Sequence, residues 1–502
     1  MSDDLTIKSW RSTLRGFIHP RVVALLFLGF SAGIPLLLIF SSLSLWLREA
    51  GVERATVTYF SWAALGFSFK FVWAPLVDQI PIPLLTRWLG RRRGWILLGQ
   101  LAIMISIILM ASVDPQSGPS SLSLMAVAAV MLGFSAATQD IAIDAYRIES
   151  AEPDLQALMS ATYIAGYRIG MLVSGAGSLF IADWLGSNRD DYLYQAWQST
   201  YWLMAMVMLV GVLTTLTIRE PARQSQTKLI ANSNRYLPIL IFFVLVVGVF
   251  ISSIYFYSSL PSVIRLLVAI AVTWVFALGL VKMRIIEYSV LDQTYIVPVQ
   301  DFFQRYGLSL ACLLLALVGL YRVSDIVLGV ISNVFYQDLG FSKSEIASVV
   351  KTFGLLMTIV GGFMGGLLSM RFGVIRVLML GGFLSAVTNL LFMVLAAKGH
   401  DITWLYIVIS ADNLSAGIAS AAFVAFLSSL TNISFTATQY AIFTSLMTFL
   451  PKVLGGYSGT MVDSMGYPKF FLVTALMGIP VLALIIYIGR RKHFSFKLMP
   501  DG

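Results

Sequence analysis

The feature that most constrains this sequence is the recurrence of apolar stretches of about twenty residues along its whole length. A helix needs roughly 20 consecutive apolar residues to cross the hydrocarbon core of a bilayer. Hydrophobic residues make up 58% of the 502 positions and charged residues only 12%, about half the usual share for a soluble domain. The stretches are too continuous for the strands of a membrane barrel, which alternate over roughly ten residues. The sequence therefore predicts an all-α membrane protein.

The stretches predict fourteen transmembrane helices. They fall at 22–47, 56–77, 95–112, 122–146, 157–182, 197–218, 237–258, 261–281, 308–336, 344–370, 376–397, 402–430, 436–460 and 468–489. An even number of crossings places both ends of the chain on one side of the membrane. Of the 34 Lys and Arg residues, 22 fall in the loops and tails of that side and 6 in the opposite loops. Because cytoplasmic loops carry the excess of Lys and Arg, we expect both termini in the cytoplasm.

The first six and the last six predicted helices repeat a pattern. The first span ends in Glu49-Ala-Gly51 with Arg54 three residues on, and the ninth ends in Asp338-Leu-Gly340 with Lys343 three residues on. Transporters are often built from such related halves. We therefore predict a retained cytoplasmic leader at 1–21, a six-helix bundle at 22–218, a linker with two additional transmembrane helices at 219–307, a second six-helix bundle at 308–489 and a cytoplasmic tail at 490–502. The additional pair is expected to pack outside the core, with Phe256 and Trp274 away from the centre.

This layout resembles the major facilitator superfamily. In both halves a short loop rich in Gly and Arg follows the second helix. In the first half it runs from Asp78 through Gly90-Arg-Arg-Arg93, and in the second it contains Arg371. The resemblance implies a gating role on the cytoplasmic side for four residues, namely Asp78, Arg91, Arg92 and Arg371.

Two acidic residues in the fourth span are candidates for proton coupling. A charge at the centre of a membrane helix costs roughly 2.5–3.5 kcal/mol, so it usually faces a bundle interior and serves a function. Asp140 and Asp144 lie four residues apart and share one helical face. A carboxyl group whose pKa is raised by burial can exchange protons near neutral pH. The alternative for each is a fixed ion pair, which Asp144 can form with Arg147 three residues on.

A cationic set accompanies these acids. Arg168, beside Tyr167, either binds a substrate carboxylate or pairs with Asp140. Arg322 and Asp325 lie three residues apart, which favours an internal ion pair, and Asp325 is a further candidate proton carrier. Cations outnumber acids within the spans, which favours an anionic solute. The predicted substrate-binding residues are Gln139, Tyr167, Arg168, Arg322, Lys351, Asp412, Asn413 and Lys452, with Arg168 and Lys452 expected to hold substrate carboxylates from opposite halves.

Other classes of function find little support. Cys312 is the only cysteine, and the three histidines have no metal-site spacing, so neither a disulfide nor a zinc site is expected. No nucleophile and base stand at a recognisable spacing, which argues against an enzyme or a membrane-embedded sensor. The net charge of +9 is carried by the loops facing the cytoplasm, which argues against nucleic acid as a partner. We expect a monomer that uses the proton gradient and no cofactor.

Several stretches of the first half resemble the AmpG-type muropeptide permeases. They lie at 28–35, 70–78, 90–95, 137–145 and 166–175, and include Gln139-Asp-Ile-Ala-Ile-Asp144. The resemblance implies proton-driven import of anhydro-muropeptides across a bacterial inner membrane, in peptidoglycan recycling and the β-lactamase induction linked to it. It also implies that Asp140 and Asp144 are the carboxylates that matter. The alternatives are a carrier of another anionic solute such as acetyl-CoA and a sugar or peptide symporter.

Overall fold

The computed structural model describes residues 16–52, 60, 66–150, 155–187, 191–221, 236–257, 259–260, 262–283, 292–341, 345–455 and 458–490. Every regular element in these ranges is helical. Lipid offers no hydrogen bonds to a backbone, so a chain this apolar satisfies its own amides within helices. The result agrees with the all-α class predicted from the sequence.

The structure describes five of the six crossings predicted up to residue 218, and part of the second. Two of them continue through a π-helical turn, at Leu38–Ser42 in the first and at Val173–Gly177 in the fifth. The elements are α2 (Pro20–Leu37), α3 (Leu43–Glu49), α5 (Gly66–Phe69), α6 (Ala74–Gln79), α7 (Leu85–Leu89), α8 (Arg91–Ala111), α9 (Pro119–Ser150), α10 (Gln156–Leu172), α11 (Ser178–Trp184), α12 (Tyr194–Val207) and α13 (Leu209–Thr217).

The second half follows two intervening helices, α14 (Tyr236–Phe256) and α15 (Ser262–Lys282). Its elements are α17 (Val297–Leu320), α18 (Val323–Asp338), the π-helix Ile346–Phe353, α20 (Gly354–Phe372), α21 (Val374–Lys398), α22 (Ile402–Leu430), α23 (Thr436–Gly455), α24 (Ser458–Leu476) and α25 (Gly478–Gly489). Within the described residues, ten helices are long and apolar enough to cross a membrane. The predicted spans 56–77, 237–258, 261–281, 344–370 and 436–460 include undescribed residues, so the count of fourteen stays a prediction.

A glycine breaks the helical geometry within two of these elements. Gly307 in α17 has φ 72° and ψ 156°, and Gly466 in α24 has φ 75° and ψ 162°. Glycine adopts positive φ without the steric cost that other residues incur. The spans predicted at 308–336 and 468–489 begin just after these breaks. Residues 297–306 of α17 therefore form a helical segment of their own.

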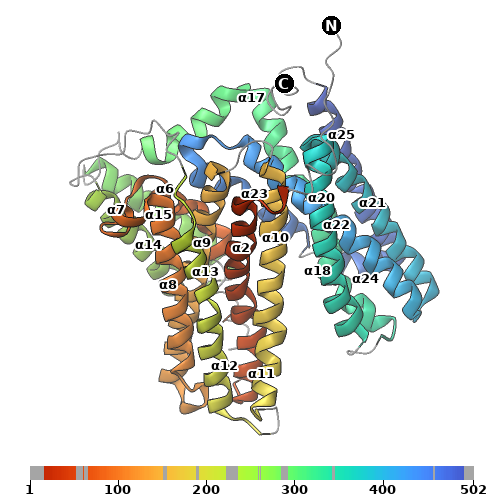
Figure 1. The fold of residues 1–502 in the computed structure, drawn as a ribbon, viewed down its shortest axis with the longest axis horizontal. Coiled ribbons are helices and arrows are strands. Elements are labelled where there is room, and N and C mark those ends of the chain that lie inside the picture. The colour runs from red at the N-terminus through yellow and green to blue at the C-terminus, as the bar shows by residue number, and fades with distance from the viewer. Residues whose placement is uncertain are drawn as a thin grey trace.

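The helices α14 and α15 lie at the outside of the molecule, against the first half (Figure 1). A few of their residues, among them Phe242 and Leu280, pack into the core of that half. Phe256 and Trp274 are 79% and 68% exposed and face away from it. The inserted pair is thus peripheral, as expected from its scarcity of charge.

The two halves contact each other at one end of the molecule and diverge toward the other (Figure 1). We call the first the contact end. The helix α10 of the first half packs against α20 and α22 of the second there, and α23 packs against α6 and α9. Gly16 lies beside Leu158 and Met370, and Gly489 beside Ile375, so α2 begins and α25 ends at this same end. The positive-inside rule identifies it with the predicted cytoplasmic side.

Within the first half, α2 and α10 touch backbone to backbone. A Cβ atom added at Gly166 would lie 1.9 Å from the Leu26 carbonyl oxygen, and one at Gly33 would lie 2.0 Å from that of Tyr167. Small residues four apart allow this approach between membrane helices. Gly29 and Gly170 complete the two pairs, with clearances of 2.2 and 2.1 Å.

We expect Gly166→Ala to destabilise the protein, because its Cβ has no room unless α2 moves away from α10. Overpacking of this kind costs about 1–3 kcal/mol. Gly177→Ala is the matched control on the same crossing, because a Cβ there meets nothing within 4 Å. The measurement is the melting temperature of each purified variant in detergent. Equal melting temperatures for the two variants would contradict the close packing.

Candidate functional site

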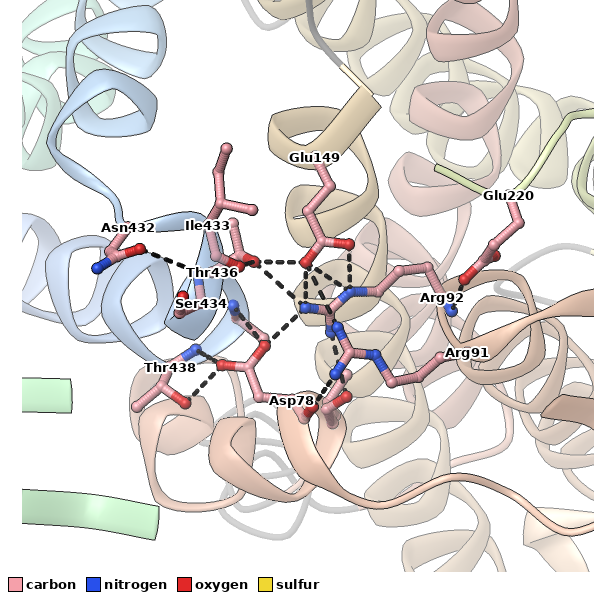
Figure 2. Close-up of polar contacts among 12 residues, drawn as sticks. Asp78, Arg91, Arg92, Glu149, Glu220, Asn432, Ile433, Ser434, Thr436 and Thr438 are labelled. Carbon is pink, nitrogen blue, oxygen red and sulfur yellow. Dashed lines mark hydrogen bonds and ion pairs between the residues drawn. The ribbon is translucent and has the colours of Figure 1, made fainter. Parts of the chain in front are cut away.

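Asp78, at the end of α6, caps a helix of the other half (Figure 2). Its Oδ1 accepts a hydrogen bond from the Ala437 amide at 3.0 Å, and its Oδ2 accepts from the amide and the hydroxyl of Thr438, both at 2.7 Å. These amides belong to the first turn of α23, where backbone N–H groups have no partner within the helix. A carboxylate there satisfies the donors and interacts favourably with the helix dipole. Asp78 is only 5% exposed, so water screens the contact little.

Arg92, in the first turn of α8, joins this cap to a second carboxylate (Figure 2). Its Nη2 lies 2.7 Å from Asp78 Oδ1, and its Nε donates to both oxygens of Glu149 at 3.0 Å. Glu149 lies at the end of α9 and also accepts a hydrogen bond from the Thr436 hydroxyl. Arg91 donates to the Asp78 carbonyl, and its Nη2 lies 3.7 Å from Glu149. The network thus connects α6, α8 and α9 of one half to the start of α23 in the other.

Glu220 holds the start of α8 in place. Its carboxylate accepts from the amides of Arg92 and Arg93 at 2.9 and 3.1 Å. It occupies the space beside Gly90, where an added Cβ would lie 2.4 Å from the Glu220 side chain. The backbone at position 90 also has φ 94°, a conformation that glycine adopts without steric cost. Helix α8 thereby presents Arg92 to Asp78 and Glu149.

Three of the four predicted gating residues, Asp78, Arg91 and Arg92, come together in this network. The fourth, Arg371, lies at the end of α20, with its guanidinium 5.6 Å from the ring centroid of Phe372. Sequence reasoning missed the partners in the network, although it had signals for them. Acidic residues stand on the loop side of the fourth span, Glu149 first among them, and threonine is a common helix-start residue at the thirteenth. The missed residues are Glu149, Glu220, Thr436 and Thr438.

A second polar cluster holds the loop that leads into α23. Gln439 Nε2 donates to the Pro298 carbonyl at 2.8 Å and to Asp301 Oδ2 at 2.9 Å. Its Oε1 accepts from Arg305 at 3.0 Å and from the Asn432 amide at 2.8 Å. Asp301 and Arg305 also form an ion pair at 2.9 Å. The segment 297–306, which follows the inserted helices, is thereby bonded to the loop that positions α23 for Asp78.

The start of this segment is tied to the first half as well. Tyr295, in the π-helix Asp292–Ile296, donates its hydroxyl to the Val72 carbonyl at 2.9 Å. Burial raises the pKa of the Tyr295 phenol, so the hydroxyl stays a donor at physiological pH. The segment that connects the halves is therefore hydrogen-bonded to the first half through Tyr295 and to the second half through Gln439.

The predicted proton carriers of the first half differ in their surroundings. Asp144 lies between two cations, 3.6 Å from Lys70 Nζ and 3.4 Å from Arg147 Nη2, so the alternative ion pair with Arg147 exists. Asp140 is 7% exposed, and its Oδ1 has no hydrogen-bond partner within the described structure. Asp140 and Arg168 form no ion pair with each other in the described part of the chain, contrary to the alternative considered for them. Asp140 is thus the less neutralised of the two acids.

Gln139 and Tyr167 lie beside these charges but in different environments. Gln139 is fully buried against α8, where a Cβ at Gly99 would lie 3.0 Å from its own Cβ. Both polar atoms of its side-chain amide lack a described partner. Tyr167 is half-buried and stacks at a tilt on Tyr163, with ring centroids 6.2 Å apart.

The second half contains a matching polar cluster around Asp325. Its Oδ2 lies 3.5 Å from Arg322 Nε, so the predicted internal pair is present, and its Oδ1 accepts from the Ser385 hydroxyl. Asp412 on α22 is close enough to interact electrostatically with both Asp325 and Arg322. Asn413 faces α20 and accepts from Thr358 at 2.9 Å.

The remaining predicted ligands are less informative. Lys351, in the π-helix that precedes α20, is exposed. Lys452 belongs to α23, but its side chain lies outside the described residues. The expected pairing of Arg168 with Lys452 across the halves is therefore neither supported nor contradicted.

Comparisons with known proteins give the family of this architecture. A family model described as the Major Facilitator Superfamily matches residues 22–321 and 313–497. The chain is 31% identical over 473 residues to a "Putative transporter AmpG 4" of Rickettsia felis, covering 94% of this chain and 97% of that protein. It is 30% identical over 484 residues to the "Anhydromuropeptide permease" of Escherichia coli K12, covering 96% of this chain and 82% of that protein.

Two solved structures share the fold at low sequence identity. The transporter FucP in its outward conformation aligns with a TM-score of 0.58 at 14% identity, covering 94% of this chain and 99% of that one. The proton:xylose symporter XylE aligns with a TM-score of 0.57 at 11% identity, covering 95% and 96%. The two-bundle architecture predicted from the repeat is therefore that of known transporters.

We expect Asp78→Asn to weaken the contact between the halves, because it removes the charge that pairs with Arg92 and caps α23. Removing one partner of a buried ion pair costs about 3–5 kcal/mol. Spin labels at the exposed positions Trp88 and Arg490, in a Cys312→Ser background, report the separation at the contact end. The distance distribution should shift to longer values. Asp183→Asn, an exposed acid on α11, is the control, and equal distributions for the two variants would contradict the role of Asp78.

Gln439→Ala should shift the same distance distribution in the same direction but by less. The substitution releases the α22–α23 loop from 297–306 and leaves the Asp78 cap itself intact. Loss of a buried hydrogen-bonding group costs about 1–3 kcal/mol. Gln198→Ala, whose amide donates to Tyr194 in α12, is the matched control. A distribution unchanged from the parent would show that the loop needs no support from 297–306.

Proposed function

Because this chain belongs to the AmpG-type permeases of the Major Facilitator Superfamily, we propose that it imports anhydro-muropeptides from the periplasm to the cytoplasm in symport with protons. It is a multi-pass membrane transporter, and its relatives are named as permeases and transporters rather than enzymes. The observation that carries the proposal is the 30% identity, over 96% of this chain, to a protein named anhydromuropeptide permease.

The charge inside the bundles supports an anionic substrate. Anhydro-muropeptides carry carboxylates as well as sugar rings. Arg168 and Arg322 bring positive charge into the interior at helix positions where each charge is costly. Neither of these residues belongs to the network at the contact end, so they are available for a function other than closure.

The network at the contact end supports alternating access. Transporters of this kind expose a central site by moving one bundle against the other. Asp78, Arg92 and Glu149 bind the start of α23 and so join the halves at the end predicted to face the cytoplasm. With this end closed, a substrate would enter from the periplasmic side, which is the direction required for import. We propose that breaking these contacts opens the path to the cytoplasm.

The proposed setting follows from the same resemblance and from the basic loops. The protein would reside in a bacterial inner membrane with both termini in the cytoplasm. It would return cell-wall fragments for peptidoglycan recycling, and the same fragments would serve in β-lactamase induction. The proton gradient would supply the energy, and no cofactor is required. The unit of transport would be a monomer, since each chain contains both halves.

Uptake into liposomes tests the substrate and the energy source together. Protein reconstituted with an imposed pH gradient, acidic outside, should accumulate N-acetylglucosaminyl-anhydro-N-acetylmuramic acid and its peptide-bearing forms. Collapse of the gradient with a protonophore should abolish the accumulation. Accumulation of acetyl-CoA, xylose or a free peptide in place of the muropeptide would contradict the proposal.

Asp140→Asn should abolish uphill uptake, because it removes the less neutralised of the two carboxyl groups of the fourth span while it preserves the shape of the side chain and its hydrogen bonding. Exchange of labelled for unlabelled substrate across the membrane should survive, since exchange requires no net proton movement. Asp183→Asn should leave both activities unchanged. If Asp140→Asn still accumulates substrate against its gradient, then Asp144 or Asp325 carries the proton instead.

A further inference from the structure

Arg168 and Arg322 lie at the same depth on opposite sides of the boundary between the halves. Arg147 donates to Ser160 of α10 at 3.0 Å and to Ser428 of α22 at 2.6 Å, so these serines mark one level near the contact end. The helix α10 runs away from that end and α22 runs toward it. Eight residues deeper on each helix, about 12 Å at 1.5 Å per residue, stand Arg168 and Ser420.

Arg322 reaches this level from the second half. Its Nη1 donates to the Ser420 hydroxyl. Arg322 is also the charged group of the second half that acts on Arg168 electrostatically. The helix register and the electrostatic interaction therefore agree that the two guanidinium groups lie near one level, one from each half.

The two guanidinium groups have unequal partners. Arg322 is held by Asp325, with 3.5 Å between Nε and Oδ2. The contact described for Arg168 within the protein is Met171 Sδ, 4.0 Å from Nη1, and a thioether sulfur is only a weak acceptor. Arginine does not lose its proton in proteins. Asp325 and Asp412 both lie near Arg322, whereas no carboxylate forms an ion pair with Arg168 within the described residues. Arg168 is therefore the guanidinium of the two that no carboxylate holds.

Resting on the proposed function, we propose that a substrate carboxylate binds between Arg168 and Arg322 and displaces Asp325 from Arg322. A guanidinium offers a planar fork of donors that matches a carboxylate. Asp325 already shows that a carboxylate fits Arg322, and the substrate would exchange one carboxylate for another there. Arg168 supplies the additional charge that favours the substrate in this exchange. Because the two arginines belong to different halves, the bound carboxylate would link the bundles at this level.

The proposal makes Asp325 a competitor of the substrate for Arg322. Substitution of Asp325 should therefore change the ligand affinity in the opposite direction from most substitutions in a binding site. Removing a residue from a binding site normally weakens binding. Asp325→Asn should instead tighten the binding of an acidic ligand, because Arg322 loses its internal partner. A neutral ligand should bind as it does to the parent protein.

The test compares two forms of one ligand on the purified full-length protein. The probes are N-acetylglucosaminyl-anhydro-N-acetylmuramic acid, with its free lactyl carboxylate, and the same disaccharide with that group converted to an amide. Titration calorimetry in detergent gives both affinities. The parent protein should prefer the acid by about 10- to 150-fold, the range of one charge-assisted hydrogen-bonded contact.

Substitutions then distinguish the role of the two arginines from that of Asp325. Arg168→Gln and Arg322→Gln should bind acid and amide alike, while Arg168→Lys should keep an intermediate preference. Asp325→Asn should raise the affinity for the acid only. Arg265→Gln, on the peripheral α15, is the matched control and should behave as the parent. Unchanged affinity for the amide shows that a variant is folded.

The outcomes distinguish failure of the clamp from failure of the proposed function. An acid preference that persists in Arg168→Gln and Arg322→Gln would overturn the clamp and leave muropeptide transport standing. A loss of acid binding in Asp325→Asn would overturn the competition and make Asp325 a ligand or a helix tie. A parent protein that binds neither probe would refute the proposed function itself.

Discussion

The two halves are joined where a carboxylate of one half accepts hydrogen bonds from the free backbone amides at the start of a helix in the other half. Asp78 meets the first turn of α23, and it does so in a nearly dry environment. Neither partner could be buried at this boundary alone without a penalty, since a lone carboxylate and a bare helix start both need hydrogen bonds. The contact is therefore favourable only while the bundles are together. This dependence makes it suited to a joint that must also open.

The arrangement around that contact keeps its net charge low. Arg91 and Arg92 bring two cations, and Asp78 and Glu149 bring two anions, so the joint is balanced within itself. The Ala437 and Thr438 amides contribute only dipoles from the second half. On opening, the first half would retain its complete set of charges, and the second would expose a helix start to water. Each half thus remains electrostatically satisfied when separated, which lowers the cost of the open state.

The fold was largely predictable because lipid leaves so few options to a backbone. Hydropathy and the repeat at 49–54 and 338–343 were sufficient for the bundle architecture and the peripheral position of α14 and α15, and the resemblance of motifs in the first half gave the family. The site was predictable only in part. A charge within a span is costly and therefore noticeable, which is why the Arg322–Asp325 pair was found, whereas Asp78 and Arg92 were found through the resemblance of their loop to the major facilitator pattern. Partner choice depends on helix rotation and register, which a sequence does not contain. The Asp140–Arg168 pairing therefore failed, and Glu149, Thr436 and the 297–306 segment went unnoticed.

The glycine contacts between α2 and α10 have a mechanical consequence. Backbones that touch directly leave no side chain between them to change rotamer, so the two helices transmit displacement as a stiff pair. Arg168 stands on α10 between Gly166 and Gly170, at the level of that contact. A displacement of Arg168 would therefore be transmitted directly to α2, because the backbone contacts at Gly166 and Gly170 lie within one helical turn of it. Binding at this single side chain could then move α2 and α10 together as one rigid unit.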